Sequence, residues 1–130
     1  MTEGSEATGE GARERPSALD DIREALRRAP RELPGLEQAL DGALAREPGR
    51  ADLHLARGLL LLYRDQEFEV ARASFARAHE LASADADLAG EAWLEEARAL
   101  ELRGQDRAAR EAAEAALAAA PAGSPRRALA

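Results

Sequence analysis

The chain has 130 residues, a formal net charge of −7 at pH 7 and a pI near 4.9, so it fits a single domain and repels nucleic acid and anionic membranes. It contains no cysteine, which excludes disulfides, thiolate nucleophiles and zinc–thiolate sites. Only 3% of its residues are aromatic and about a quarter are alanine, so the expected core consists of leucines and close helix contacts through alanine.

The segment 1–15 is rich in small, acidic and glycine residues and has no large apolar side chain after Met1. It buries too little surface to offset its ordering entropy, so we expect a disordered tail. It also lacks the basic start and apolar run of a secretory signal. The longest purely apolar run, 59–63, is far shorter than the ~18 residues of a membrane span. We therefore expect a soluble, cytoplasmic protein that does not bind membranes.

The first expected helical hairpin spans about 17–47. Ser17 and Asp20 have the spacing of a capping box, which predicts a helix that starts there and stops near Pro30. A second helix is expected between Pro34 and Pro48. Apolar residues at helical spacing line one face of each helix, Leu19, Ile22 and Leu26 in the first and Leu36, Leu40, Ala43 and Leu44 in the second.

The second expected hairpin spans 51–82. Its first helix, about 51–64, is apolar on more than one side and should be the most buried helix of the chain. Asp65 is the expected cap of its second helix. The inward face of that second helix is expected to consist of Phe68, Ala71, Phe75 and Ala78.

The third expected hairpin spans 88–120 and follows a short polar connection. Asp85 or Asp87 is expected to cap its first helix, because the rest of a calcium-loop pattern is missing. Gly104 separates this helix from the last one, about 105–120, which is almost entirely alanine. Beyond Pro121 we expect a flexible tail, 122–130.

A repeat period of about 35 to 38 residues runs through the three hairpins, as in arrays of helical hairpins. The third hairpin resembles the tetratricopeptide repeat (TPR) pattern, in register and without a gap, through Trp93, Ala97, Leu100, Ala109, Ala116 and Pro121. It departs from the pattern at Glu96, where leucine is expected, and at Ala113, where phenylalanine is expected. The second hairpin is similar to the pattern through Leu55, Leu62, Ala71, Phe75 and Ala78, with Gly58 and Leu59 in swapped order and Ser83 in place of proline. The first matches, with an inter-helix loop one residue longer, through Leu19, Ile22, Leu26, Leu36, Leu40, Ala43 and Pro48.

The resemblance covers about 16–121 and implies an all-α fold, a short right-handed α-solenoid of three antiparallel helical hairpins. A small residue at Gly58 and at Ala97 would let the two helices of a hairpin approach closely, and Phe75 would fill the space toward the next hairpin. Trp93 is expected in the core.

In the TPR family the first helix of each hairpin lines a concave groove. Carried over to this chain, the resemblance implies a groove lined by Asp20, Asp21, Glu24, Arg27, Arg28, Leu53, Ala56, Arg57, Leu60, Tyr63, Arg64, Glu91, Leu94, Glu95, Arg98 and Glu101. An apolar centre flanked by carboxylates suits a partner protein segment with aliphatic anchors and basic flanks. We therefore expect a protein–protein interaction adaptor or scaffold. The alternative is a structural or regulatory subunit that docks through its alanine-rich helix 105–120, for example as a homodimer.

Catalytic chemistry is not expected. His54 and His79 lie on different expected helices without metal-ligand spacing, and we interpret both as surface or packing residues. The glutamates of the third hairpin are interpreted as solvated charges, Glu91, Glu95, Glu96 and Glu101. The sequence therefore predicts no enzyme activity, no cofactor and no metal site.

Overall fold

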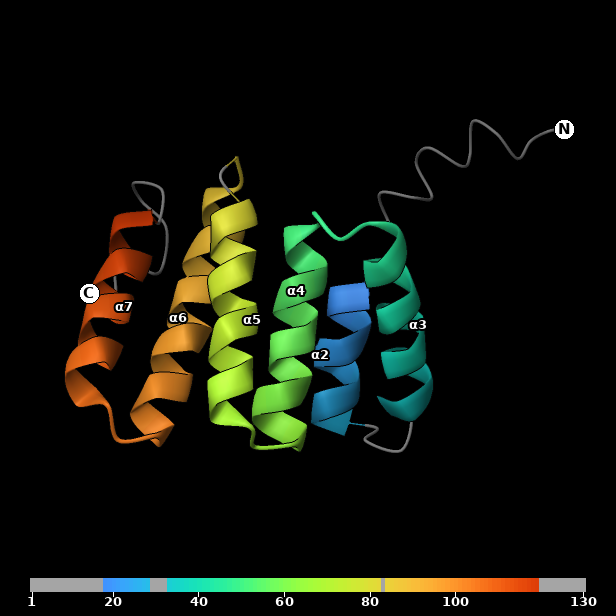
Figure 1. The fold of residues 1–130 in the computed structure, drawn as a ribbon, viewed down its shortest axis with the longest axis horizontal. Coiled ribbons are helices and arrows are strands. Elements are labelled where there is room, and N and C mark those ends of the chain that lie inside the picture. Colours follow the sequence, from blue (N-terminus) through green and yellow to red (C-terminus); the bar gives the residue numbers. More distant parts are fainter. Residues whose placement is uncertain (1–17, 29–32, 83, 120–130) are drawn as a thin grey trace, which may run out of the picture.

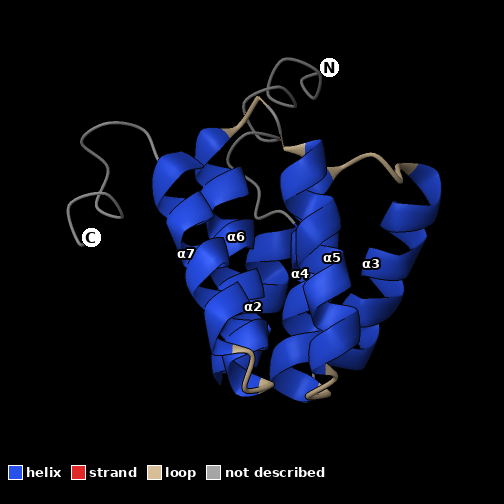
Figure 2. Ribbon diagram, turned by 60° about the vertical axis from the view of Figure 1, so that its left-hand side comes forward, coloured by secondary structure: helices blue, strands red, loops and turns tan. Residues whose placement is uncertain are grey.

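The computed structural model describes residues 18–28, 33–82 and 84–119, and within these ranges the chain is all-helical, with no strand (Figure 2). The expected tails 1–15 and 122–130 and the expected cap Ser17 lie outside the described residues. The helices are α2 (Ala18–Arg28), α3 (Leu33–Arg46), α4 (Ala51–Leu59), the π-helical turn η2 (Leu60–Arg64), α5 (Phe68–Leu81), α6 (Ala86–Leu102) and α7 (Asp106–Ala119).

The helices lie side by side in a row, with α3 at one end and α7 at the other (Figure 1). The α3–α4 connection lies at the upper edge of this view, whereas α4–α5 and α6–α7 are joined at the lower edge, so joined helices run in opposite directions. Each helix packs on the next one along the chain. In addition, α4 contacts both α2 and α6, so these three helices share one side of the molecule.

The main core is centred on α4, as its two apolar stripes predict. Six of its nine residues are buried, a larger share than in any other described α-helix. The ring of Phe75 from α5 is fully buried and lies against Gly58 of α4. The expected close approach of these two helices is thus confirmed, because only a residue without a side chain leaves room for the ring.

The last two helices pack through a smaller cluster. Ala97 and Leu100 of α6 meet Ala109 and Ala112 of α7, and Trp93 packs partly buried against them. The opposite face of α7 is exposed and charged, with Arg107, Arg110, Glu111 and Glu114. The alanine stripe of this helix therefore faces the chain's own α6.

One helix start and one helix end differ from expectation. Asp65 does not cap α5: its carboxylate pairs with the guanidinium of Arg64 at 2.7 Å, Gln66 adopts a φ of 57°, and Glu67 precedes the helix without a side-chain cap. The helix expected over 51–64 is α-helical only to Leu59 and finishes as η2. By contrast, the predicted cap Asp85 is confirmed, since its carboxylate accepts a hydrogen bond of 3.0 Å from the Leu88 amide.

An ion-pair network joins α3 to α4 and η2. Glu37 of α3 accepts hydrogen bonds from Arg57 at 2.9 Å and from Arg64 at 2.7 Å. The hydrogen bond from Arg64, followed by the one from Arg57, holds the pKa of Glu37 below its ordinary value against the opposing effect of burial. The network fastens α3 to the helix at the centre of the core.

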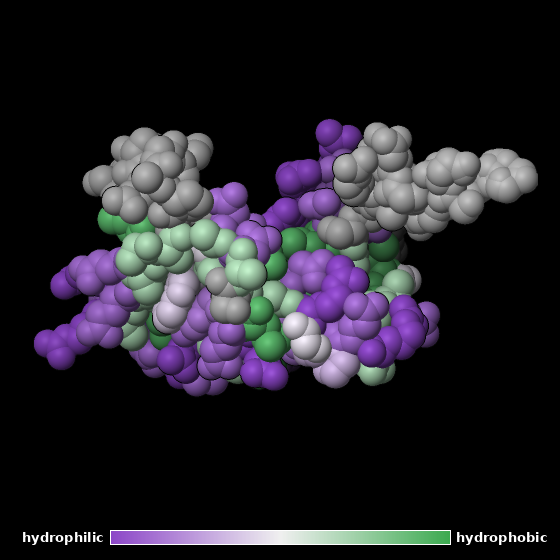
Figure 3. All heavy atoms as spheres, turned by 90° about the horizontal axis from the view of Figure 1, so that it is seen from above, coloured by the Kyte–Doolittle hydropathy of each residue, from purple (hydrophilic) through white to green (hydrophobic). Residues whose placement is uncertain are grey.

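The surface seen from above is mainly hydrophilic, with smaller hydrophobic areas between the charged side chains (Figure 3). Among the described residues, the exposed large apolar side chains are Tyr63, Val70, Leu94 and Leu102. No helix in the described ranges is long and apolar enough to cross a membrane.

Candidate interaction site

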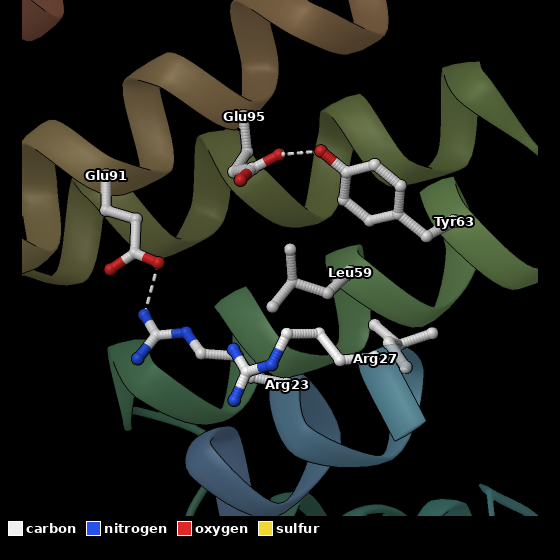
Figure 4. Close-up of a pocket in the computed structure, with 7 residues that line it drawn as sticks. Arg23, Arg27, Leu59, Tyr63, Glu91 and Glu95 are labelled. Atoms are coloured by element: carbon white, nitrogen blue, oxygen red, sulfur yellow. Dashed lines mark hydrogen bonds and ion pairs between the residues drawn. The ribbon is translucent and has the colours of Figure 1, made fainter. Parts of the chain in front are cut away.

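A pocket of about 550 Å³ opens on the side of the molecule shared by α2, α4 and α6 (Figure 4). Its lining combines three apolar or aromatic side chains with two arginines and two glutamates, namely Arg23, Leu26 and Arg27 of α2, Leu59 of α4, Tyr63 of η2, and Glu91 and Glu95 of α6. The pocket is thus assembled from three stretches of chain that are far apart in the sequence, namely α2, α4 with η2, and α6.

Helical spacing brings the lining residues of each element to one face. Arg23 and Arg27 are four residues apart, and so are Glu91 and Glu95, a separation that stacks side chains one turn above the other. Leu59 stands between the arginine wall and the glutamate wall (Figure 4). Because Leu59 is only 4% exposed, it belongs to the core and to the floor of the pocket at once.

Two polar contacts cross the pocket. Arg23 pairs with Glu91, which links α2 to α6. The Tyr63 hydroxyl donates a hydrogen bond of 2.7 Å to Glu95, which links η2 to α6. Both contacts are drawn in Figure 4 and together they fix the width of the pocket.

The environment of Glu95 disfavours its charge. Burial raises the pKa of the Glu95 carboxyl, while the hydrogen bond from Tyr63 and the positive charge of Arg98 oppose that shift. Burial also raises the pKa of Tyr63, as does its hydrogen bond to Glu95, so the hydroxyl keeps its proton and acts as the donor. Glu95 is therefore a partly desolvated carboxylate held by a neutral group.

The arginines of the pocket are better compensated. Arg23 pairs with Asp20 at 3.2 Å in addition to Glu91. Arg27 pairs with Glu24 at 2.7 Å, and Glu24 also pairs with Arg28 at 3.1 Å. Within the described residues, no arginine donates a hydrogen bond to Glu95. The pocket carboxylate without an arginine hydrogen bond is therefore Glu95 of α6, on which Arg98 and Arg23 act only through their charge.

The structure brings together only part of the groove implied by the TPR resemblance. Of the expected lining, Arg27, Tyr63, Glu91 and Glu95 border the pocket. Leu94 and Arg98 are exposed on the neighbouring surface of α6. Asp20 and Glu24 instead form ion pairs along α2, where Asp21 is half-buried.

For three residues, the expected position at the apolar centre of the groove is wrong. Leu53, Ala56 and Leu60 are 1%, 0% and 0% exposed, so they fill the core and cannot line an open groove. Arg57 and Arg64 also point elsewhere, because both engage Glu37 of α3. The face of α4 and η2 that borders the pocket is therefore rotated around the helix axis from the face that the resemblance implies.

The pocket residues that sequence reasoning missed are Arg23, Leu26 and Leu59. Leu26 was assigned to the core face alone, although it is only half-buried and also borders the pocket. A usable signal was the spacing of Leu59 and Tyr63, four residues apart like Glu91 and Glu95. The π-helical turn η2, where Asp65 N donates to Leu60 O at 3.2 Å, has a wider winding than an α-helix and sets the orientation of Tyr63.

A second pocket, of about 430 Å³, lies between α6 and α7. It is bordered by Ala97, Glu101, Asp106, Ala109, Arg110 and Ala113. Glu101, which was expected in the groove, thus lies in this pocket. The apolar lining residues of this pocket are alanines, so it offers less apolar surface than the first pocket.

A buried charge cluster stands on the other side of α6. Glu96 is 4% exposed and its carboxylate contacts His79 at 2.7 Å and Arg72 at 3.2 Å, both from α5. The His79 ring stacks on Trp93 with a centroid distance of 3.5 Å and an interplanar angle of 11°. The interpretation of Glu96 as a solvated charge is wrong, because α5 supplies two partners that allow burial.

No family model, no curated protein and no solved structure matches the chain in comparisons with known proteins. In the part of the chain that the structure describes, no group of three or more histidine, aspartate and glutamate side chains is arranged to hold a metal ion. Of these two pockets the first is therefore the candidate site on geometry alone, because it is the larger of the pair and has an apolar floor and charged walls.

Proposed function

We propose that the chain is a cytoplasmic protein–protein interaction adaptor of the TPR-like type. In this proposal the pairs α2–α3, α4–α5 and α6–α7 are three antiparallel hairpins stacked as a short right-handed solenoid. A segment of another protein binds on the side shared by α2, α4 and α6. The segment carries aliphatic anchors and basic flanks.

The observation that carries the proposal is the pocket built jointly by α2, α4, η2 and α6. These are the first helices of the three proposed hairpins, and a binding groove on such helices is what stacked hairpins offer. Leu59 and Tyr63 give the pocket an apolar or aromatic surface, and interface anchors of this kind supply most binding energy.

The exposed face of α7 supports the adaptor over a self-associating subunit. That face carries Arg107, Arg110, Glu111 and Glu114, whereas its alanines at 109, 112 and 116 are buried. A charged outer face suits a terminal helix that meets water. Light scattering over a wide concentration range measures this directly, and we expect a monomer.

The test of the adaptor function is capture from native cell extract with pocket and control variants. Tyr63→Asp combined with Glu95→Arg changes two pocket residues, and Val70→Asp changes an equally exposed apolar residue on α5. We expect a specific partner to be captured by the wild type and by Val70→Asp and lost with the pocket variant. Circular dichroism checks that each variant stays helical.

A photo-crosslinking residue at position 63 then identifies the bound segment, with position 70 as the control. A partner retained by the pocket variant, or crosslinked from position 70 alone, would move the binding site to another face.

A further inference from the structure

Glu95 is the pocket carboxylate whose hydrogen-bond donor is a neutral group, and this defines what the pocket can hold. The arginines on the opposite wall are neutralised by their own carboxylate partners, Arg23 by Asp20 and Glu91 and Arg27 by Glu24. Glu95 receives a hydrogen bond from the neutral Tyr63 hydroxyl instead. An incoming cation would therefore gain a charge-assisted hydrogen bond at Glu95, whereas an incoming anion would have to displace ion pairs at the arginines.

The arrangement of apolar and charged surfaces in the pocket favours a cation on a long apolar side chain. The floor of the pocket is the side chain of Leu59, with the Tyr63 ring beside it and Glu95 on the wall above (Figure 4). Leu26 also lines the pocket. A long side chain with an apolar stem and a charged end matches this order of surfaces, because the stem lies on the leucines and the end reaches the carboxylate. The Tyr63 ring adds a favourable face for a cation.

We propose that the pocket recognises one arginine or lysine side chain of the partner segment, with Glu95 as the anion that binds its charged end. This inference rests on the proposed adaptor function and specifies which chemical group of the partner enters the site. Glu95 is partly buried, so the cost of desolvating its charge is offset when a cation binds, and the attraction is stronger here than at an exposed carboxylate.

Of the two arginine charges that act on Glu95, that of Arg98 has the larger effect and that of Arg23 the smaller. Arg98 acts on Glu95 through its charge from the same helix, and its own side chain is exposed. An exposed arginine keeps its hydration, whereas a partner cation enters on the apolar floor, so the two do not exclude each other. Removing Arg98 should accordingly strengthen binding of a basic side chain.

The experiment is selection of a displayed random heptapeptide library on the full chain. The same library is selected on Glu95→Gln and on Glu114→Gln, a matched change at an exposed position on α7. We expect the wild type and Glu114→Gln to enrich peptides with an arginine or lysine at one fixed position, next to an aliphatic residue. Glu95→Gln should lose that preference, although the glutamine oxygen can still accept from Tyr63.

A synthetic peptide from the enriched set gives the affinity by calorimetry. Replacing its basic residue by citrulline keeps the shape of arginine and removes the charge, and we expect binding to wild type to weaken at least tenfold. On Glu95→Gln the same replacement should change affinity less than about twofold. The citrulline comparison needs no protein variant, so equal binding of the two peptides overturns the proposal even if Glu95→Gln folds poorly.

The outcomes separate this inference from the function on which it rests. Enriched peptides without a basic position, or with an acidic residue there, would overturn the cation pocket and leave the adaptor function standing. Equal binding of the arginine and citrulline peptides would do the same. If no peptide family is enriched on the wild type beyond the level on Tyr63→Asp with Glu95→Arg, both are overturned.

Discussion

The ring of Phe75 occupies the space that a side chain at position 58 would need. A methyl group added at Gly58 would lie 2.6 Å from Cδ1 and 2.9 Å from Cζ of that ring, closer than carbon atoms pack. Phe75 is fully buried, so the ring has no free volume into which it can move. The close packing of α4 on α5 thus depends on glycine at position 58, which has no Cβ.

Replacing Gly58 by alanine should destabilise the protein by about 1 to 3 kcal/mol, because overpacking outweighs the gain in helix propensity. Gly42→Ala is the matched control: it lies within α3 and its added methyl meets Arg46 Nη1 at 3.5 Å, an ordinary contact. We expect this control to stabilise by about 0.5 to 1 kcal/mol. Urea denaturation of both variants measures the difference, and equal effects at the two glycines would contradict the packing argument.

Glu96→Ala should cost about 1 to 3 kcal/mol, because the buried His79 ring loses the hydrogen-bond partner that it contacts. A double variant, Glu96→Leu with His79→Phe, replaces this pair by apolar groups of similar size and should recover most of the loss. Arg72 is exposed enough to turn to water. Denaturant unfolding provides the free energies, and a double variant that is no better than Glu96→Ala would show that the polar pair itself is required.

Glu95→Gln should change stability in a pH-dependent way whose sign follows from burial. The folded pKa of Glu95 is raised above its ordinary value, so its favourable contribution is complete at low pH and is lost as pH rises through the folded pKa. The stability of Glu95→Gln relative to wild type should therefore be higher at pH 7 than near pH 4. Unfolding curves across this range test the trend, with Glu114→Gln expected to show none.

Glu37→Gln should show the opposite sign. The folded pKa of Glu37 is lowered, chiefly by the hydrogen bond from Arg64, so its contribution is present above the ordinary pKa of 4.5 and is lost as pH falls through the lowered value. We expect a loss of up to about 1 kcal/mol at neutral pH, as for a surface ion-pair network, which disappears in acid. Salt should reduce the loss; insensitivity to both salt and acid would mean that the network adds nothing.

The helices themselves could be predicted from the sequence, because their signals are local. Proline and glycine at 30, 34, 48 and 104 separate runs with helical apolar spacing, and Asp85 has a helix-capping position that the structure confirms. Asp65 offered the same local signal and was misread. The reason is that Arg64 next to it competes for the carboxylate, a side-chain choice that spacing does not encode.

The site was harder to predict because it depends on contacts between helices. Leu60 and Leu59 are adjacent and alike in sequence and both belong to the core, yet only Leu59 also borders the pocket. The burial of Glu96 depends on partners from α5, and the width of the pocket depends on Arg23 meeting Glu91 across 68 positions. Periodicity gives the faces of a helix, but the neighbours decide which face is open.

The stacking of Trp93 on His79 provides an intrinsic fluorescence probe. Trp93 is the chain's only tryptophan, and its emission depends on contact with the imidazole from α5. The helix that carries this indole also carries both carboxylates of the pocket. We therefore expect a ligand that shifts α6 against α5 to change the fluorescence of the native protein, which would report occupancy of the site without an attached dye.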